Sequence, residues 1–320
     1  MSLRIPKFNE LPTIGESNEH HAWEVFGKED HLGTMNFITN EKVVSACTMV
    51  RNGKVICLSL PLNVPSPSLV KSRDDFRHEV HVSRSGRDDL LDNFYLQSSS
   101  QWDSLRHIRY REFGYYGGRE ESDLDTSNDL GIDFIAKNGI ITRGVLVDLE
   151  AYFATTNYPV DPRERRAFTT QDIDRVLEWQ GVTVLPGDIL LFRTGWLKWY
   201  LSIPTEQRIE LKGSMHPGEG GLDVPGIEAG KETARWLWDH KVAAVAADNP
   251  SFEVLRVNKE RGFLHRLLIP LLGMPIGEFW FLEDLSEFCS SSKQYEFLLV
   301  SAPLNLPKGV GSPNNAYAIF

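Results

Sequence analysis

Short apolar runs rich in β-branched residues recur along the chain and predict strands. The run at residues 139–148 is β-branched and apolar, and the run at 187–195 begins and ends with glycine. Runs of this length, bounded by turn-forming residues, are typical of strands rather than helices. We therefore predict strands at residues 54–61, 139–148, 187–195, 242–248 and 296–303, and we interpret the first as buried.

Segments with apolar residues at helical spacing lie between some of these runs. Residues 40–50 begin at an asparagine cap, and residues 169–179 open with a threonine cap. A third amphipathic segment, 224–240, leads directly into the strand predicted at 242–248. Strands outnumber long helices and alternate with them only in the middle of the chain. This order favours the α+β class over a doubly wound parallel sheet.

The expected architecture is a single layered β/β/α domain, similar to swivelling domains, with a mixed sheet flanked by helices. Residues 1–30 are polar and irregular, and we expect an N-terminal arm there that lies over the body formed by residues 31–320. No glycine-rich phosphate loop follows a predicted strand, which argues against nucleotide binding.

Residues 97–107 carry the most informative polar pattern. Gln97, Gln101, Asp103 and His107 all fall at odd-numbered positions. On an extended backbone alternate side chains face the same way, so Gln101, Asp103 and His107 would share one side. A buried row of this kind is costly unless a metal, a substrate or hydrogen-bond partners satisfy it. A solvated loop is the alternative that this segment alone leaves open.

Two further ionisable residues lie inside apolar sequence far downstream. His265 belongs to a helix-like run at 263–273, and Glu278 stands among bulky apolar residues. A buried glutamate needs a cation or strong hydrogen-bond donors, and Arg266 is one alternative partner. Asp103, His265 and Glu278 together match the oxygen-rich set with one imidazole that binds a divalent cation.

Composition argues against several classes of function. The 320-residue chain has a net charge of −10 and no basic stripe, so we expect no nucleic-acid partner. Cys47, Cys57 and Cys289 form no CxxC pair and have apolar neighbours, so we expect reduced thiols in the core. The chain has no signal pattern and no run of 18 apolar residues, which predicts a cytoplasmic protein with no membrane partner.

An ordered series of short segments resembles one family along nearly the whole chain. The chain is similar to the cyclase family of metal-dependent hydrolases, which includes bacterial-type kynurenine formamidase and isatin hydrolase. The matching segments are 30–36, 58–63, 187–196, 248–251, 265–266, 277–278 and 311–316. Their order along the chain is far more specific than any one of them.

The family signature, His-x-Gly-Thr-His-x-Asp-x-Pro-x-His, aligns with residues 97–107. Asp103 and His107 keep the family's aspartate and last histidine, whereas both earlier histidines are replaced by Gln97 and Gln101. The resemblance implies that Asp103 binds a metal and that His107 is the catalytic acid and base.

The resemblance also implies that His265 and Glu278 complete the metal site with Asp103. An amide oxygen is a harder and weaker ligand than imidazole, so the two glutamines disfavour a two-zinc site. We expect one divalent ion, Mn²⁺ or Mg²⁺ rather than Zn²⁺, with Gln97 or Gln101 as an outer or weak ligand. A metal-free pocket is the alternative.

The function implied by the resemblance is hydrolysis of a formamide, cyclic amide or lactone bond, as in an arylformamidase of tryptophan, kynurenine or aromatic-compound catabolism. His107 would take a proton from water and pass it to the leaving atom. No Gly-x-Ser-x-Gly motif supports a serine nucleophile. The alternative is a metal-poor homologue that binds a small molecule without hydrolysing it. Family membership further implies a homo-oligomer, a dimer or tetramer.

Four side chains are candidates for contact with a small-molecule substrate. They are Trp102, Phe76, His81 and Tyr115, which would wall a pocket suited to an aromatic compound. Aromatic side chains are more often part of the core, and this is the alternative for each of them.

Overall fold

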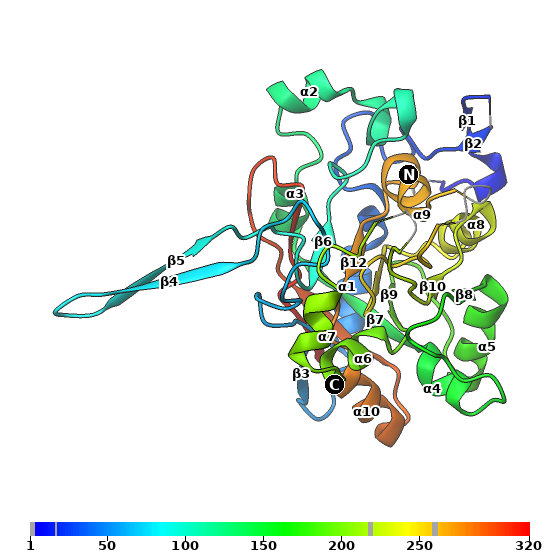
Figure 1. Ribbon diagram of the computed structural model, residues 1–320. Helices are drawn as coiled ribbons and strands as arrows, with labels where there is room; N and C mark the ends of the chain where they lie inside the picture. The colour runs from blue at the N-terminus through cyan, green and yellow to red at the C-terminus, as the bar shows by residue number, and fades with distance from the viewer. Residues whose placement is uncertain (1–3, 17, 217–219, 258–261) are drawn as a thin grey trace.

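The computed structural model describes residues 4–16, 18–216, 220–257 and 262–320, and one nine-stranded sheet forms its centre (Figure 1). The strand order is β14-β6-β12-β11-β9-β7-β13-β15-β3. In that order the strands span Gly311–Pro313, Gln101–Asp103, Ile276–Glu278, Ala244–Ala247, Ile189–Arg193, Ile140–Asp148, Glu296–Ser301, Ala316–Ile319 and Val55–Cys57. The four strands from β12 to β7 run parallel and the other pairs are antiparallel. The prediction of an α+β domain with a mixed sheet is confirmed.

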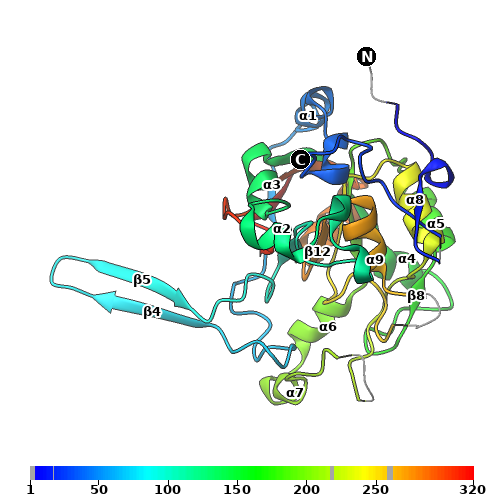
Figure 2. The ribbon, with the colours of Figure 1, turned by 90° about the horizontal axis from the view of Figure 1, so that it is seen from above.

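Helices flank this sheet, as both ribbon views show (Figures 1 and 2). They are α1 Asn40–Cys47, α2 Glu121–Thr126, α3 Ile132–Asn138, α4 Leu149–Ala154, α5 Thr170–Gln180, α6 Trp196–Ser202, α7 Thr205–Glu210, α8 Lys231–Asp239, α9 Leu264–Leu267 and α10 Glu283–Ser292. The predicted threonine cap of α5 is confirmed, because the Thr169 hydroxyl accepts a hydrogen bond from the Asp172 amide at 3.2 Å. The cap of α1 is Thr39 rather than Asn40.

The prediction of a helix at 224–240 was wrong for the residues before Lys231, where α8 begins. Gly226–Ile227 instead forms the short strand β10, which pairs with β8, Ala167–Phe168. Gly230 then has φ 138°, a conformation outside the helical region, so α8 begins one residue later.

The prediction of a buried strand at 54–61 was also wrong. The observed β3 lies at the edge of the sheet, and of its three residues only Ile56 is buried. Cys57 therefore faces outward, and Cys47 is exposed at the end of α1, contrary to the expectation of core thiols. Cys289 is buried as expected.

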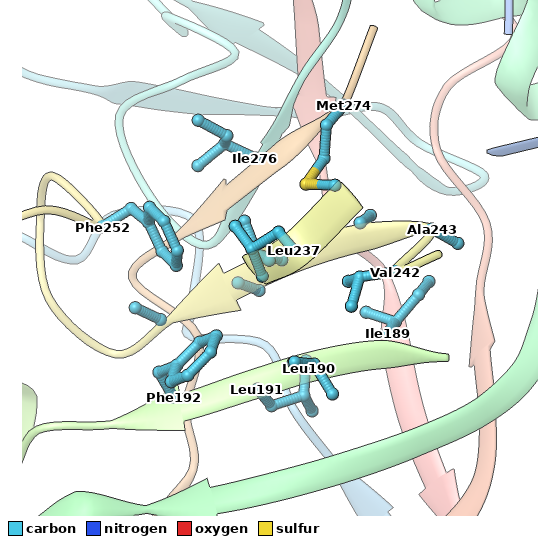
Figure 3. Packing of buried hydrophobic residues seen from close by; sticks show 14 of the residues in the cluster. Ile189, Leu190, Leu191, Phe192, Leu237, Val242, Ala243, Phe252, Met274 and Ile276 are labelled. Carbon is cyan, nitrogen blue, oxygen red and sulfur yellow. The ribbon is translucent and has the colours of Figure 1, made fainter. Parts of the chain in front are cut away.

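The core surrounds the parallel strands at the centre of the sheet (Figure 3). Every residue of β9 and β11 is buried, which explains why their sequences are nearly continuous apolar runs. Leu237 of α8 and Phe252 pack in the same cluster as these strands. Because both faces are covered, the carboxyl ends of these strands are held in fixed positions.

Described residues among the first thirty contact the body. They include β1, Thr13–Ile14, and β2, Glu19–His20. The Ala22 amide donates to the Leu271 carbonyl at 2.8 Å, and the Trp23 indole donates to the Pro270 carbonyl at 2.7 Å. The boundary at residue 30 stays a prediction. None of the helices in the described residues is long and apolar enough to span a membrane.

One element stands apart from the body. Strands β4, Arg77–Val82, and β5, Arg87–Asp92, form a hairpin that projects far from the rest of the molecule in both ribbon views (Figures 1 and 2).

Candidate active site

Two neighbouring strands bring the first site residues together. β6 pairs with β12 in antiparallel register, with Gln101 opposite Glu278. Gln101 and Asp103 are two positions apart on β6, so they share a face as predicted. His107 reaches this region differently, because the strand ends at Asp103 and the His107 amide closes a turn onto the Ser104 carbonyl at 3.1 Å.

The structure brings Asp103, His265 and Glu278 into one buried group. Each residue offers a ligand atom, and these atoms all lie within 4.8 Å of one another. His265 Nε2, on α9, is 3.2 Å from Glu278 Oε1 and 3.6 Å from Asp103 Oδ2. His107 Nε2 lies 3.9 Å from the same Asp103 oxygen. The two polar clusters of the sequence therefore form one site.

The two glutamines hold the carboxylates of this group. Gln97 donates a hydrogen bond from Nε2 to Asp103 Oδ1, and Gln101 donates one from Nε2 to Glu278 Oε2. Arg266, the alternative partner for Glu278, is exposed, and the described hydrogen bonds of Glu278 come from Gln101 and His265.

The unsatisfied atoms of the site fit a hard divalent cation. Gln101 Oε1 and Asp103 Oδ2 are buried and have no hydrogen-bond donor within the described part of the chain. Burying acceptors in this way is costly, and an ion between them would satisfy both. Carboxylate and amide oxygens with one imidazole suit Mn²⁺ or Mg²⁺ better than Zn²⁺. Gln101 thus keeps an oxygen without a donor in the described residues, whereas the described side-chain hydrogen bond of Gln97 is through its amide hydrogen.

Sequence reasoning missed Glu253, the carboxylate on the far side of His265. Glu253 is fully buried, and both of its oxygens lie 3.1 Å from His265 Nδ1. Its Oε2 also accepts from the His265 backbone amide at 3.2 Å. The signal was available, because Glu253 stands between Phe252 and Val254, an apolar setting like that of Glu278.

The local charges set the protonation of the site. Burial raises the pKa of Glu278 to about 7, although the hydrogen bond with His265 opposes this shift. Burial alone would lower the pKa of His265, but Glu253 and the other carboxylates hold it well above its usual value. Burial would likewise raise the pKa of Asp103, but the nearby imidazoles hold it low. Burial lowers the pKa of His107, which makes a neutral imidazole its main form at neutral pH.

A cavity of about 480 Å³ opens onto the group. Its polar wall includes Gln97, Gln101, His107, His265 and Glu278, and the ring of Phe263 stacks on His265 with centroids 4.9 Å apart. The volume lies within the range of small-molecule pockets. A second cavity of about 490 Å³ lies beside α1 and α3, and no ionisable side chain lines it.

The lining of the first cavity includes none of the four side chains predicted to contact substrate. Trp102 is buried in the core and donates to the Ser301 hydroxyl at 3.0 Å. Tyr115 is buried and donates to Glu121 at 2.8 Å. Phe76 packs against a neighbouring aromatic ring, and His81 is exposed on the projecting hairpin. The structure instead places Met215, Leu255, Val257, Phe263 and Phe279 on the apolar wall.

The fold and site define a single α+β domain with a buried candidate metal centre at a cavity wall. The chain belongs to the cyclase family, because the Cyclase family model matches residues 56–254. A crystal structure of a novel cyclase is 30% identical, covers 94% of this chain and 99% of its own, and superposes with a TM-score of 0.81.

More distant structures share the fold. Isatin hydrolase A from Labrenzia aggregata, solved with benzyl benzoate bound, is 17% identical, with coverage of 87% of this chain and 97% of its own and a TM-score of 0.59. A "predicted metal-dependent hydrolase" from Bacillus stearothermophilus is 16% identical, with coverage of 84% and 98% and a TM-score of 0.50. A search of curated proteins found no match.

Proposed function

We propose that this protein is a metal-dependent hydrolase that cleaves an amide or lactone bond. The observation that carries the proposal is the buried group of Asp103, His265 and Glu278, whose ligand atoms lie within 4.8 Å of one another. His265 and Glu278 of this group line the cavity. One divalent ion, Mn²⁺ or Mg²⁺, would be held by these residues, with Gln101 Oε1 as a further ligand. When bound, the ion would polarise the scissile carbonyl and lower the pKa of a water molecule.

His107 would move the proton in this reaction. It lines the cavity, its Nε2 is 3.9 Å from Asp103 Oδ2, and its lowered pKa leaves the imidazole free to accept a proton at neutral pH. His107 would take the proton of the attacking water and then give it to the leaving nitrogen or oxygen. The nearby Asp103 carboxylate would stabilise the imidazolium that forms between these two steps.

The cavity supports a small aromatic substrate. Its apolar wall would contact a ring, and Arg73, Arg256 and Arg266 also line it and would attract an acidic group. An arylformamidase-like reaction in tryptophan or other aromatic catabolism meets these requirements, as does opening of a cyclic amide such as isatin. We propose that this occurs in the cytoplasm and in a homo-oligomer.

Metal content and turnover test the proposal together. Purified protein should contain about one equivalent of divalent metal by elemental analysis, since one set of ligands is present. N-formylkynurenine, isatin and simple lactones should be assayed with added Mn²⁺, Mg²⁺ or Zn²⁺, with chelated protein as the control. Absence of both metal and turnover under every condition would refute the proposal.

A second candidate function rests on the glutamine hydrogen bonds. Gln97 and Gln101 each donate a hydrogen bond to one carboxylate, and these bonds offset part of the cost of burying the carboxylates when no ion is bound. A metal-poor protein that binds a small molecule without hydrolysing it would use the same cavity. Saturable binding of one of these compounds to metal-free protein, with no turnover on adding metal, would favour this alternative.

A further inference from the structure

The segment that joins His265 to Glu278 contains an unusual helical turn. Helix α9 is followed directly by the π-helix η5, Leu268–Leu272. Pro270 lies inside η5 and has no N–H, so it cannot donate the hydrogen bond that would continue an α-helix. Helices of the π type are rare and often occur at functional sites. We refer to residues 265–278 as the ligand connector, because two of the three candidate metal ligands lie at its ends.

The two ends of the ligand connector are held differently. Glu278 belongs to β12, which pairs with β11 on one side and with β6 on the other. His265 lies outside the sheet, on α9, which spans only four residues. Helices this short are unstable by themselves in water, so the position of His265 depends on what packs against the connector. Glu253 contacts the amide and the ring of His265, which leaves the rest of the connector to be anchored by other residues.

Residues 22–34 supply anchors for the end of η5. The Ala22 amide and the Trp23 indole donate to the carbonyls of Leu271 and Pro270, at 2.8 and 2.7 Å. The last carbonyls of a helix have no partner within it, so their donors must come from elsewhere. Both of these carbonyls belong to buried residues, so water cannot easily replace the donors. The blue N-terminal part of the chain lies beside the orange α9 in both ribbon views (Figures 1 and 2).

Thr34 anchors a third carbonyl and connects it to the sheet. Its amide donates to the Gly273 carbonyl at 2.8 Å, and its hydroxyl lies 2.7 Å from the Ala243 carbonyl and 3.2 Å from that of Gly273. Ala243 immediately precedes β11, the strand that pairs with β12. The two backbones touch here, because a Cβ at Gly33, which has φ 55°, would lie 1.9 Å from the Gly273 oxygen. The ligand connector is therefore fixed to residues 22–34 at three consecutive points.

We propose that residues 22–34 position the metal site, by holding the ligand connector so that His265 stays beside Glu278. Trp23 and Thr34 are then positioning residues, which act on the site through the connector. Metal ligands must lie within about 0.2 Å of their preferred distances, so a small shift of α9 would weaken binding of an ion. This role rests on the proposed function, since it requires that His265 and Glu278 bind one ion.

Hydrogen–deuterium exchange of the metal-free protein tests the anchoring. Trp23→Phe removes the indole donor to Pro270 and keeps an aromatic ring. Exchange across the ligand connector should become at least about fivefold faster, because a buried carbonyl loses its partner. Trp236→Phe is the matched control: Trp236 is also half-buried and its indole donates at 2.9 Å, but to Asp174 on α5, so the connector should exchange as in the wild type. Connector exchange in Trp23→Phe within about twofold of the wild type would overturn the proposal.

Titration calorimetry with Mn²⁺ measures the effect on the metal site. Trp23→Phe should bind Mn²⁺ about 2–30-fold more weakly than the wild type, and Trp236→Phe should bind it equally well. Thermal melting verifies that each variant is folded at the assay temperature. Unchanged affinity in Trp23→Phe would overturn the positioning role. A wild type that binds no Mn²⁺ would instead refute the proposed function, and the exchange comparison, which needs no metal, would then decide this proposal.

Thr34 gives an independent test with a conservative rescue. Thr34→Val keeps the shape of the side chain but removes the hydroxyl, and it should weaken Mn²⁺ binding by a similar factor. Thr34→Ser restores the hydroxyl and should bind Mn²⁺ within about twofold of the wild type. A Thr34→Val protein that melts at a lower temperature but binds Mn²⁺ as the wild type does would show a purely structural role and overturn the assignment of Thr34.

Discussion

Replacing Glu253 by glutamine is expected to weaken metal binding while the protein stays folded. Glu253 is the carboxylate behind His265, with both oxygens 3.1 Å from Nδ1. The contact between Glu253 and Nδ1 fixes the His265 ring so that Nε2 faces Asp103 and Glu278. The negative charge of Glu253 also makes the imidazole a stronger ligand for a cation. Glutamine has the same shape but is neutral, and its NH₂ group can replace one of the two acceptors.

The expected loss follows from what Glu253 contacts. Removing the hydrogen-bond partner of a metal-binding histidine typically costs about 10–100-fold in metal affinity. This range corresponds to about 1.4–2.8 kcal/mol. We expect a loss in the upper part of this range, because Glu253 is fully buried and also accepts a hydrogen bond from the His265 backbone amide at 3.2 Å. In Glu253→Gln, an NH₂ group on that side would face this N–H donor.

Titration calorimetry with Mn²⁺ on wild-type and Glu253→Gln protein measures this effect, and thermal melting checks the fold. Asp223→Asn is the matched control, because it removes one carboxylate whose described contact is Arg256, at 3.0 Å on the cavity lining. Its affinity should stay near that of the wild type. An affinity of Glu253→Gln within about twofold of the wild type would refute the role given to Glu253 in orienting His265.

Three further outcomes are expected. His107→Ala should lower kcat by about 10²–10⁴-fold with metal content unchanged, and full activity would remove His107 from the mechanism. Arg193→Met should lower the free energy of unfolding in urea by about 3–5 kcal/mol, because Arg193 bonds Asp148 at 2.8 Å in a buried setting; a loss under about 1 kcal/mol would contradict this. Apparent Mn²⁺ affinity should rise as the pH increases through 7, since burial raises the pKa of Glu278 to about 7 and binding must displace its proton. A flat pH profile would argue against Glu278 as a ligand.

The sequence predicted correctly those strands and helices whose residues follow one clear pattern of apolar positions. The parallel strands β9 and β11 are buried on both faces, so their apolar runs were unambiguous. The edge strand β3 was misread because three alternating residues resemble the start of a buried run. The helix start at Lys231 was missed because the β10 pairing with β8 depends on a partner about sixty residues away, which periodicity cannot show.

Residues of the candidate site could be predicted only where an ionisable side chain stands in a sequence segment in which such side chains are rare. A carboxylate or imidazole in an apolar run is rare, and that signal found His265 and Glu278. Trp102 illustrates the limit. It is adjacent to two site residues on β6, but strand alternation points it to the opposite face, where it packs edge-to-face with Trp280 at 4.9 Å. The apolar wall of the cavity comes from distant segments, and no local pattern connects them.

The charge balance of the site favours an ion over an empty pocket. Three buried carboxylates, Asp103, Glu253 and Glu278, surround the single imidazole of His265. Buried charge must be compensated, and His265 can supply one positive charge, whereas burial lowers the pKa of His107 and keeps it neutral. Burial raises the pKa of Glu278, and the neighbouring Asp103 and Glu253 carboxylates raise it further. A divalent cation bound at His265 Nε2, in place of the proton there, would offset two of the three negative charges, whereas the imidazolium offsets one.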